Sequence, residues 1–144
     1  MNVGIKSLSG ILPEYHTEGS AGLDVRAYIE DEICIKRGKI SMVHTGLFFD
    51  IPQGFEIQVR ARSGLASKHG IGLANGVGTI DSDYTGELII PLINLGEEDY
   101  VVKNNDRIAQ ILLARCERIN WQEREKIDKG EGRQNRGFGH TGIA

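Results

Sequence analysis

Two aspartates and a tyrosine stand close together in the segment GTIDSDYTGE, residues 78–87. The glycines near its ends and the apolar runs on either side predict a hairpin turn. No turn requires Asp81, Asp83 and Tyr84 at its tip, however. An exposed aspartate is ionised at neutral pH and can accept a proton, so the segment is a candidate site of general-base catalysis. For Asp83 we favour the simpler interpretation, in which its carboxylate stabilises the turn through backbone hydrogen bonds.

Polar groups at three further places in the sequence are candidates for ligand binding or catalysis. Arg62, Ser63 and Gly64 directly follow an apolar strand pattern, and an arginine, a hydroxyl and free backbone N–H groups together suit an anion. Because Arg-Ser-Gly is a common tripeptide, a solvated turn is the alternative. Asp24 lies in a short apolar strand, where it is either a surface acid or a functional one. Gln110 lies in an apolar run, and a buried amide must find partners in the fold or on a ligand.

The last fifteen residues, GEGRQNRGFGHTGIA, differ in kind from the rest of the chain. They are rich in glycine, basic, and unable to form a core element. A frayed terminus is one interpretation. The other is a lid over a nucleotide: Phe138 between Gly137 and Gly139 offers a flat ring for a base, while Arg133 and Arg136 offer cations for phosphate.

The elements that must position these groups are mostly strands. Residues 55–61 (FEIQVRA) alternate between apolar and polar, and residues 107–116 (RIAQILLARC) predict a buried strand because turn chemistry precedes them. Residues 87–95 (ELIIPLINL) are apolar on both faces, as in the core of a sandwich, and Pro91 among them should lie at a sheet edge or bulge. Only residues 63–70 favour a helix, of one or two turns. The pattern predicts an all-β sandwich or barrel.

Composition places the chain among globular proteins of one domain. It has 144 residues and a net charge of −3 with acids and bases interspersed, which argues against a nucleic-acid or membrane surface. We expect no signal peptide and no membrane-spanning run. Cys34 and Cys116 lie in apolar runs without metal-ligand spacing, so we expect buried free thiols in a reducing cytoplasm.

Five segments in order, AGLDVRA, RSGLASKHG, GTIDSDYTGE, RIAQ and RGFGHTG, closely resemble the motifs of the trimeric deoxyuridine triphosphate nucleotidohydrolases, or dUTPases. The resemblance spans nearly the whole chain. It implies a distorted jelly roll or β-clip-type barrel over residues 1–129 and a flexible arm over residues 130–144 that closes on the active site. It also implies a homotrimer whose shared sites combine motifs from three chains. The tail departs from the commonest family form, since Gln134 and Arg136 replace two glycines.

The resemblance implies hydrolysis of dUTP to dUMP and pyrophosphate by in-line attack of water on the α-phosphorus. Such an enzyme limits uracil incorporation into DNA and supplies dUMP for dTMP synthesis. Asp81 would be the base that activates the water, and Asp24 would hold the waters of a Mg²⁺ ion that arrives with the triphosphate. Tyr84 would pack under the deoxyribose and leave no room for a 2′-hydroxyl.

The remaining substrate contacts that the resemblance implies fall into three sets. The phosphates would be held by Arg62, Ser63, Gly64, Gln110 and Arg133. Uracil would be read by Asn75 and the backbone of Gly78, Thr79 and Ile80. The arm would close with Phe138 on the base, followed by Gly139, His140 and Thr141.

Two rivals share the expected fold. A dCTP deaminase usually has a longer chain and a glutamate as its base, whereas Asp81 followed by Tyr84 is the dUTPase pattern. A regulatory nucleotide-binding protein would not need every catalytic position filled. The sequence therefore favours a cytoplasmic dUTPase whose partners are dUTP and its own copies, with no direct nucleic-acid or membrane binding.

Overall fold

The structure is a computed structural model and describes residues 1–127. The expected arm over residues 130–144, with Arg133, Phe138, Gly139, His140 and Thr141, lies outside the described residues. The elements are β1 (Gly4–Ser7), β2 (Leu23–Arg26), β3 (Ile33–Ile35), β4 (Ile40–His44), β5 (Leu47–Asp50), β6 (Phe55–Arg60), α1 (Ser63–His69), β7 (Ile71–Leu73), β8 (Gly78–Ile80), β9 (Ile89–Asn94), β10 (Tyr100–Val102) and β11 (Arg107–Arg115).

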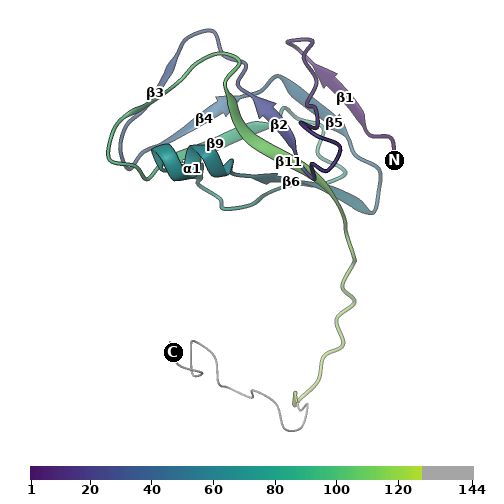
Figure 1. Ribbon diagram of the computed structural model, residues 1–144. Coiled ribbons are helices and arrows are strands. Elements are labelled where there is room, and N and C mark those ends of the chain that lie inside the picture. The colour runs from purple at the N-terminus through teal and green to yellow at the C-terminus, as the bar shows by residue number, and fades with distance from the viewer. Residues whose placement is uncertain (128–144) are drawn as a thin grey trace.

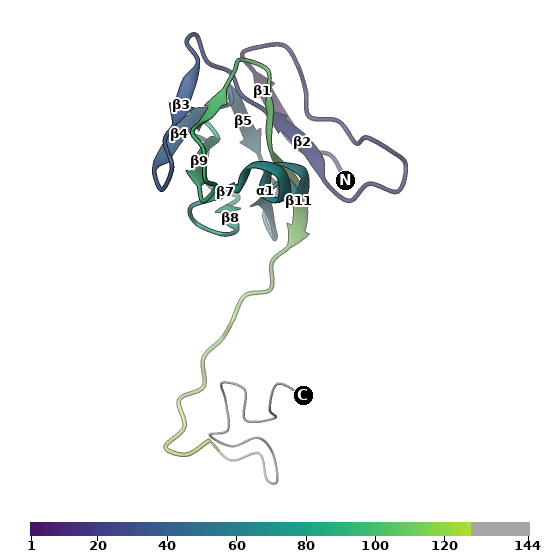
Figure 2. The same cartoon turned by 60° about the vertical axis from the view of Figure 1, so that its left-hand side comes forward.

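The strands form four antiparallel sheets, which confirms the all-β prediction. The largest has the order β2-β11-β6-β8, the next has the order β4-β9-β7, and β1-β5 and β3-β10 are pairs. Figures 1 and 2 show the sheets gathered into one body, with α1 at its side and the chain after β11 leading away from it. Within residues 1–127, no helix is long and apolar enough to cross a membrane.

The core follows the alternation that the sequence predicts. In β6, Ile57 and Val59 are buried, while Arg60 at the end of the strand is exposed. In β11, Ile108 and Ile111 are buried, and the strand pairs with both β2 and β6. The prediction of a buried strand over residues 107–116 is therefore right only for its first half, since Leu113 is 37% exposed.

The single predicted helix is confirmed as α1. It ends at Gly70, whose left-handed φ of 67° lets its N–H close on the carbonyl of Ala66. A side chain at Gly70 would also collide with the backbone of Gly96, at 2.4 Å from its nitrogen. The glycine therefore both ends the helix and lets the chain turn sharply into β7.

The prediction that Pro91 lies at a sheet edge or bulge is wrong, because β9 is the middle strand of its sheet. Pro91 pairs with Met42 of β4, and its carbonyl accepts the N–H of Ala74 on the other side, at 2.8 Å. The N–H that proline lacks would point to that same side, just beyond the last β7 pair, Leu73 with Leu92. The missing donor thus falls where the ladder ends, and the strand tolerates it.

The prediction of a hairpin at residues 78–87 is also wrong. The two strands that flank the segment do not pair with each other: β8 pairs with β6, whereas β9 pairs with β4 and β7. Both flanks are apolar because each is buried in its own sheet, and the sequence pattern does not distinguish that arrangement from a hairpin. The segment therefore passes from one sheet to the other, with a tight turn where Tyr84 N–H donates to Asp81 O at 3.1 Å.

The expectation of buried thiols is wrong for Cys34, which is exposed, and Cys116 is only half-buried; both are free. In β3 the alternation turns Ile35 inward and Cys34 outward. Cys116 follows the last residue of β11, where the strand leaves the core.

Candidate active site

A cavity of about 360 Å³ opens beside the 78–87 segment. Its walls come mainly from β6, β7, β8, β9 and the segment itself, so both of the larger sheets contribute. Six of the residues predicted for catalysis and substrate binding line it: Asn75, Gly78, Thr79, Ile80, Asp81 and Tyr84. The fold brings these six residues together in a single concave site.

Gly78 allows the wall of this cavity to form. A Cβ at this position would lie 3.1 Å from the Cβ of Val59 and 3.3 Å from the side-chain amide nitrogen of Asn75. Both contacts are tighter than ordinary packing, because Gly78 is buried and pairs directly with Val59. The absence of a side chain thus lets β8 approach β6 and leaves room for the Asn75 amide.

Tyr84 folds back over its own segment. Its hydroxyl donates to the backbone carbonyl of Glu87 at 2.9 Å, and a Cβ on Gly86 would lie only 2.5 Å from that hydroxyl oxygen. The side chain is nevertheless 47% exposed. The ring is therefore fixed at its hydroxyl end and open over much of its surface, as a stacking or packing platform for a ligand would be.

Asp81 is exposed beside the same cavity, and one thiol lies within its electrostatic reach. Burial raises the pKa of the Cys116 thiol, and the negative charges of Glu56 and Asp81 and a hydrogen bond with Glu56 raise it further. Cys116 is consequently protonated at neutral pH and brings no charge to Asp81.

Glu87 is a residue of this cavity that the sequence did not predict. Its carboxylate accepts hydrogen bonds from His44 Nδ1 at 2.9 Å, Thr45 N–H at 3.2 Å and Gly46 N–H at 2.8 Å. Burial alone would raise the pKa of Glu87, but the His44 hydrogen bond, the two backbone donors and the attraction of His44 together lower it. The sequence analysis singled out its segment but gave Glu87 no role, because all its partners lie about forty positions away in the chain.

A second group of predicted residues meets around Asp24 on β2. One carboxylate oxygen accepts Arg62 Nε at 3.0 Å and the other accepts Arg107 Nη1 at 3.3 Å. Arg62 also donates to the backbone carbonyl of Arg107 at 3.0 Å. Gln110 of β11 is directly opposite Asp24 in the sheet register. Asp24 is thus an acid that two arginines hold by ion pairs.

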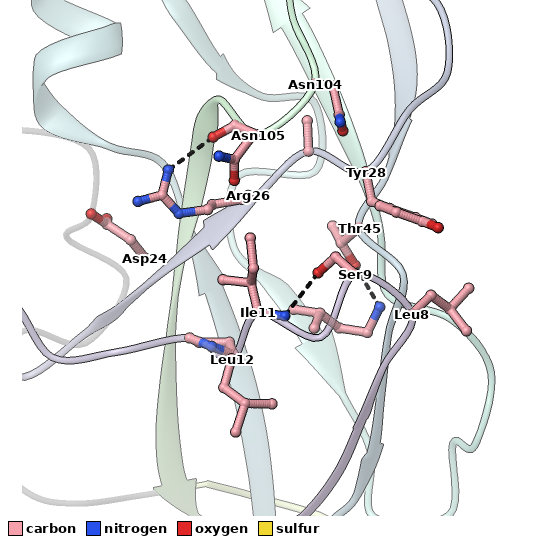
Figure 3. Close-up of a pocket in the computed structure, with 13 residues that line it drawn as sticks. Leu8, Ser9, Ile11, Leu12, Asp24, Arg26, Tyr28, Thr45, Asn104 and Asn105 are labelled. Carbon is pink, nitrogen blue, oxygen red and sulfur yellow. Dashed lines mark hydrogen bonds between the residues drawn. The ribbon is translucent and has the colours of Figure 1, made fainter.

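Asp24 borders two further cavities. The first, of about 370 Å³, lies between residues 8–13 and β2, where Arg26 donates to the backbone carbonyl of Asn105 at 2.9 Å (Figure 3). The second, of about 360 Å³, is lined by Asp24 together with Gln110. The Asp24 side chain is 20% exposed, so solvent reaches it despite its two ion pairs.

Ser63 and Gly64 open α1 directly after Arg62 and are both exposed. No side chain caps the start of this helix. The Arg62 side chain turns toward Asp24, which connects the start of α1 to the Asp24 group. Asp24 and Gln110 line cavities other than the one beside the 78–87 segment.

The described residues do not form a metal cage, since no group of three or more His, Cys, Asp or Glu side chains among residues 1–127 could hold an ion. Asp24 fits a weaker role. Each of its oxygens accepts one hydrogen bond, and a carboxylate offers about four lone-pair sites. The free sites suit the waters of an ion that its substrate carries, which is how Mg²⁺ usually binds beside phosphates.

Comparison with known proteins gives one family and many relatives. The family model described as dUTPase matches residues 9–142. Proteins named deoxyuridine 5′-triphosphate nucleotidohydrolase include one from Finegoldia magna, 50% identical over 92% of this chain and 92% of its own length. A second, from Rickettsia felis, is 50% identical over 96% of this chain and 93% of its own.

Solved structures support the same fold at lower sequence identity. A mutant of the Staphylococcus bacteriophage 80alpha dUTPase, with dUpNHpp, has a TM-score of 0.83 at 21% identity, and the match covers 99% of both chains. A mutant of the dUTPase from phage phi11 of S. aureus, described with a structural Mg(II) ion, has a TM-score of 0.77 at 19% identity. That match covers 90% of this chain and 100% of the phage chain.

Proposed function

The chain belongs to the dUTPase family, and on that premise we propose that it hydrolyses dUTP to dUMP and pyrophosphate. The observation that carries the proposal is the cavity in which Asp81 and Tyr84 lie together with Asn75 and β8. Such a site offers an exposed carboxylate, a ring and a run of backbone groups, which is what selective hydrolysis of a nucleotide needs.

Asp81 is the general base in this proposal. Its carboxylate is exposed and accepts a proton from the water that attacks the α-phosphorus, while pyrophosphate leaves on the opposite side. Aspartate is a weak base, so the phosphorus must be made more electrophilic. Mg²⁺ bound with the triphosphate would supply that effect by drawing negative charge from the phosphate oxygens.

Arg62, Ser63, Gly64 and Gln110 hold the phosphates in this proposal, and Asp24 holds the waters of the metal ion. The ion pair of Arg62 with Asp24 and the register of Gln110 opposite Asp24 support the grouping. An arginine already oriented by a carboxylate loses less conformational freedom when phosphate binds. Arg133, the proposed clamp on the terminal phosphate, lies outside the described residues.

Base and sugar selection belong to the 78–87 segment. Backbone groups of Gly78, Thr79 and Ile80, with the Asn75 amide, would pair with uracil, and cytosine would leave a buried group unpaired. Tyr84 would lie under the deoxyribose and exclude a 2′-hydroxyl by contact. The open face of the Tyr84 ring supports this role.

A homotrimer with shared sites completes the proposal. The Asp24 group and the 78–87 segment line separate cavities, which supports a site that different chains complete. Beyond β11, residues 117–127 are exposed along their whole length and include three large apolar side chains, Ile119, Trp121 and Ile127, at 68–86% exposure. Burial against neighbouring copies would remove this apolar surface from water. Two free cysteines support a reducing, cytoplasmic setting.

The test is pyrophosphate release from dUTP, the other deoxynucleoside triphosphates and UTP, with and without Mg²⁺. Among these nucleotides, we expect only dUTP to release pyrophosphate at an appreciable rate. Mg²⁺ should increase that rate. Ammonia release from dCTP would instead favour a deaminase on the same fold. Tight dUTP binding without any turnover would favour a regulatory nucleotide-binding protein.

A further inference from the structure

Glu87 joins the 78–87 segment to a distant turn of the chain. Its carboxylate accepts three hydrogen bonds, from His44 Nδ1 at 2.9 Å, Thr45 N–H at 3.2 Å and Gly46 N–H at 2.8 Å. These three residues span the end of β4 and the connection to β5. An ionised carboxylate that accepts several such bonds is held more firmly than a surface acid with one partner.

The turn that receives Glu87 is itself held by hydrogen bonds. The Thr45 hydroxyl donates to the backbone carbonyl of Leu88 at 2.6 Å, and Leu88 N–H donates to Leu47 O at 2.8 Å, so two further bonds flank the carboxylate. Gly46 has a φ of 64°, and a Cβ there would lie 2.8 Å from the Tyr28 ring. Both features explain why glycine occupies this position, since a side chain would be strained and would collide with Tyr28.

The anchored residue is also the one that holds Tyr84. The Tyr84 hydroxyl donates to the Glu87 carbonyl at 2.9 Å, and the missing side chain of Gly86 leaves space for the ring. Tyr84 is half exposed, so this bond is a main restraint on its orientation. A surface tyrosine without such a restraint changes rotamer on a fast timescale.

We infer that Glu87 is a positioning residue for sugar selection: its three bonds to residues 44–46 fix the carbonyl that holds Tyr84, and thereby the steric barrier to a 2′-hydroxyl. This inference rests on the proposed function, because it assigns Glu87 a part in the same site. A Tyr84 ring that changes position excludes a 2′-hydroxyl less well. Removing the bonds of the Glu87 carboxylate should therefore raise the hydrolysis of UTP relative to that of dUTP.

The experiment measures kcat/KM for dUTP and for UTP in the full-length protein and its variants. Glu87→Ala removes all three bonds, and we expect the dUTP-to-UTP ratio to fall about tenfold, as the loss of one well-placed restraint would produce. Glu87→Gln keeps an oxygen for the two backbone donors and an amide for His44, so its ratio should stay within about twofold of wild type. Tyr84→Ala is the positive control, and Asp31→Ala, at an exposed acid on the connection from β2 to β3, is the matched negative control.

A double-mutant cycle isolates the route through Tyr84. Tyr84→Phe already removes the bond to Glu87, so adding Glu87→Ala should change the ratio little further. If Glu87→Ala does not fold, His44→Ala carries the test, because it removes one bond to the Glu87 carboxylate at an exposed position, and the dUTP-to-UTP ratio should fall in the same direction.

The outcomes separate this inference from the function on which it rests. If the wild-type protein does not hydrolyse dUTP, the proposed function is wrong and the inference falls with it. If it does, but Glu87→Ala lowers kcat/KM for both nucleotides equally, Glu87 only supports the fold and the inference alone is overturned. Equal loss in Glu87→Gln and Glu87→Ala would likewise overturn it.

Discussion

Asp81 and Asp83 are two positions apart, yet only Asp81 lines the cavity of the 78–87 segment. If Asp81 is the base, Asp81→Asn removes the proton acceptor and keeps the size of the side chain. We expect kcat to fall by roughly 10²–10⁴-fold while nucleotide binding is preserved. Single-turnover kinetics and calorimetric binding of a non-hydrolysable analogue would measure the two effects. Asp83→Asn is the matched control and should turn over at a near-native rate; the reverse pattern would move the base to Asp83.

The carboxylate of Glu87 also predicts a dependence of stability on pH. Burial opposes its ionisation, but the hydrogen bonds from His44 and the 45–46 backbone outweigh burial and lower its pKa in the folded chain from the ordinary value of 4.5. A lowered folded pKa stabilises the protein above the unfolded pKa, and this contribution disappears as pH falls through the folded value. The difference in unfolding free energy between wild type and Glu87→Gln should therefore be largest near neutral pH and shrink below about pH 4.5. Urea unfolding across this range would measure it, and a difference that stays constant into acid would contradict the prediction.

At the scale of elements, Asn94 joins the end of β9 to the end of β3 and to the loop that follows β9. Its side chain is fully buried, donates to the carbonyls of Ile35 and Glu98 at 2.8 Å each, and accepts Gly96 N–H at 2.9 Å. Asn94→Ala would leave these backbone groups without partners, and we expect the unfolding free energy to fall by about 2–4 kcal/mol. Urea unfolding would measure it.

A matched control for Asn94 is Asn104, which accepts a single bond from Ile29 N–H at 3.1 Å in an exposed turn. Asn104→Ala should cost about 1 kcal/mol or less, because water can replace the lost partner. Equal losses at the two positions would show that the buried network of Asn94 is not what stabilises the end of β9.

The sequence predicted those elements whose burial repeats along the chain. Strand β6 alternates because one face is buried, and α1 ends at a glycine that the turn requires. It did not predict which strands pair: the flanks of residues 78–87 are buried in different sheets, and Pro91 is central in one of them. An apolar pattern indicates that a strand is buried, but it does not indicate which strand pairs with it.

The residues of the candidate site also fall into those that the sequence predicted and those that it did not. Local motifs that match the family contain Asp81, Tyr84 and Asp24. The sequence therefore predicted these three residues individually. Glu87 was not predicted, because its importance depends on partners at residues 44–46, which only the folded chain brings near it. Long-range hydrogen bonds of this kind leave no local pattern in a single sequence.

At the scale of the whole molecule, the proposed arm makes a prediction from its composition. Residues 130–144 contain Arg133 and Phe138 but few apolar side chains. Their deletion should leave the melting temperature and oligomeric state almost unchanged, and lower dUTP turnover by about 10²-fold or more because a phosphate clamp acts as charge develops. Thermal melting, sedimentation and kinetics would measure this. Arg133→Ala should reproduce much of the loss and Arg136→Ala little of it; early melting of the truncated chain would show instead that the arm is structural.

Shared sites make a sharper prediction, because a site built from several chains can be restored by mixing two inactive variants. Asp81→Asn inactivates the 78–87 segment, and Arg133→Ala inactivates the arm. In the proposed trimer, these two parts of one site come from different chains. When equal amounts of the two variants are unfolded and refolded together, about a quarter of the sites should receive an intact copy of both parts. Turnover should therefore rise to about a quarter of that of wild-type protein refolded in the same way. If one chain supplied both parts of its own site, every site would keep one defect, and the mixture would be no more active than its components.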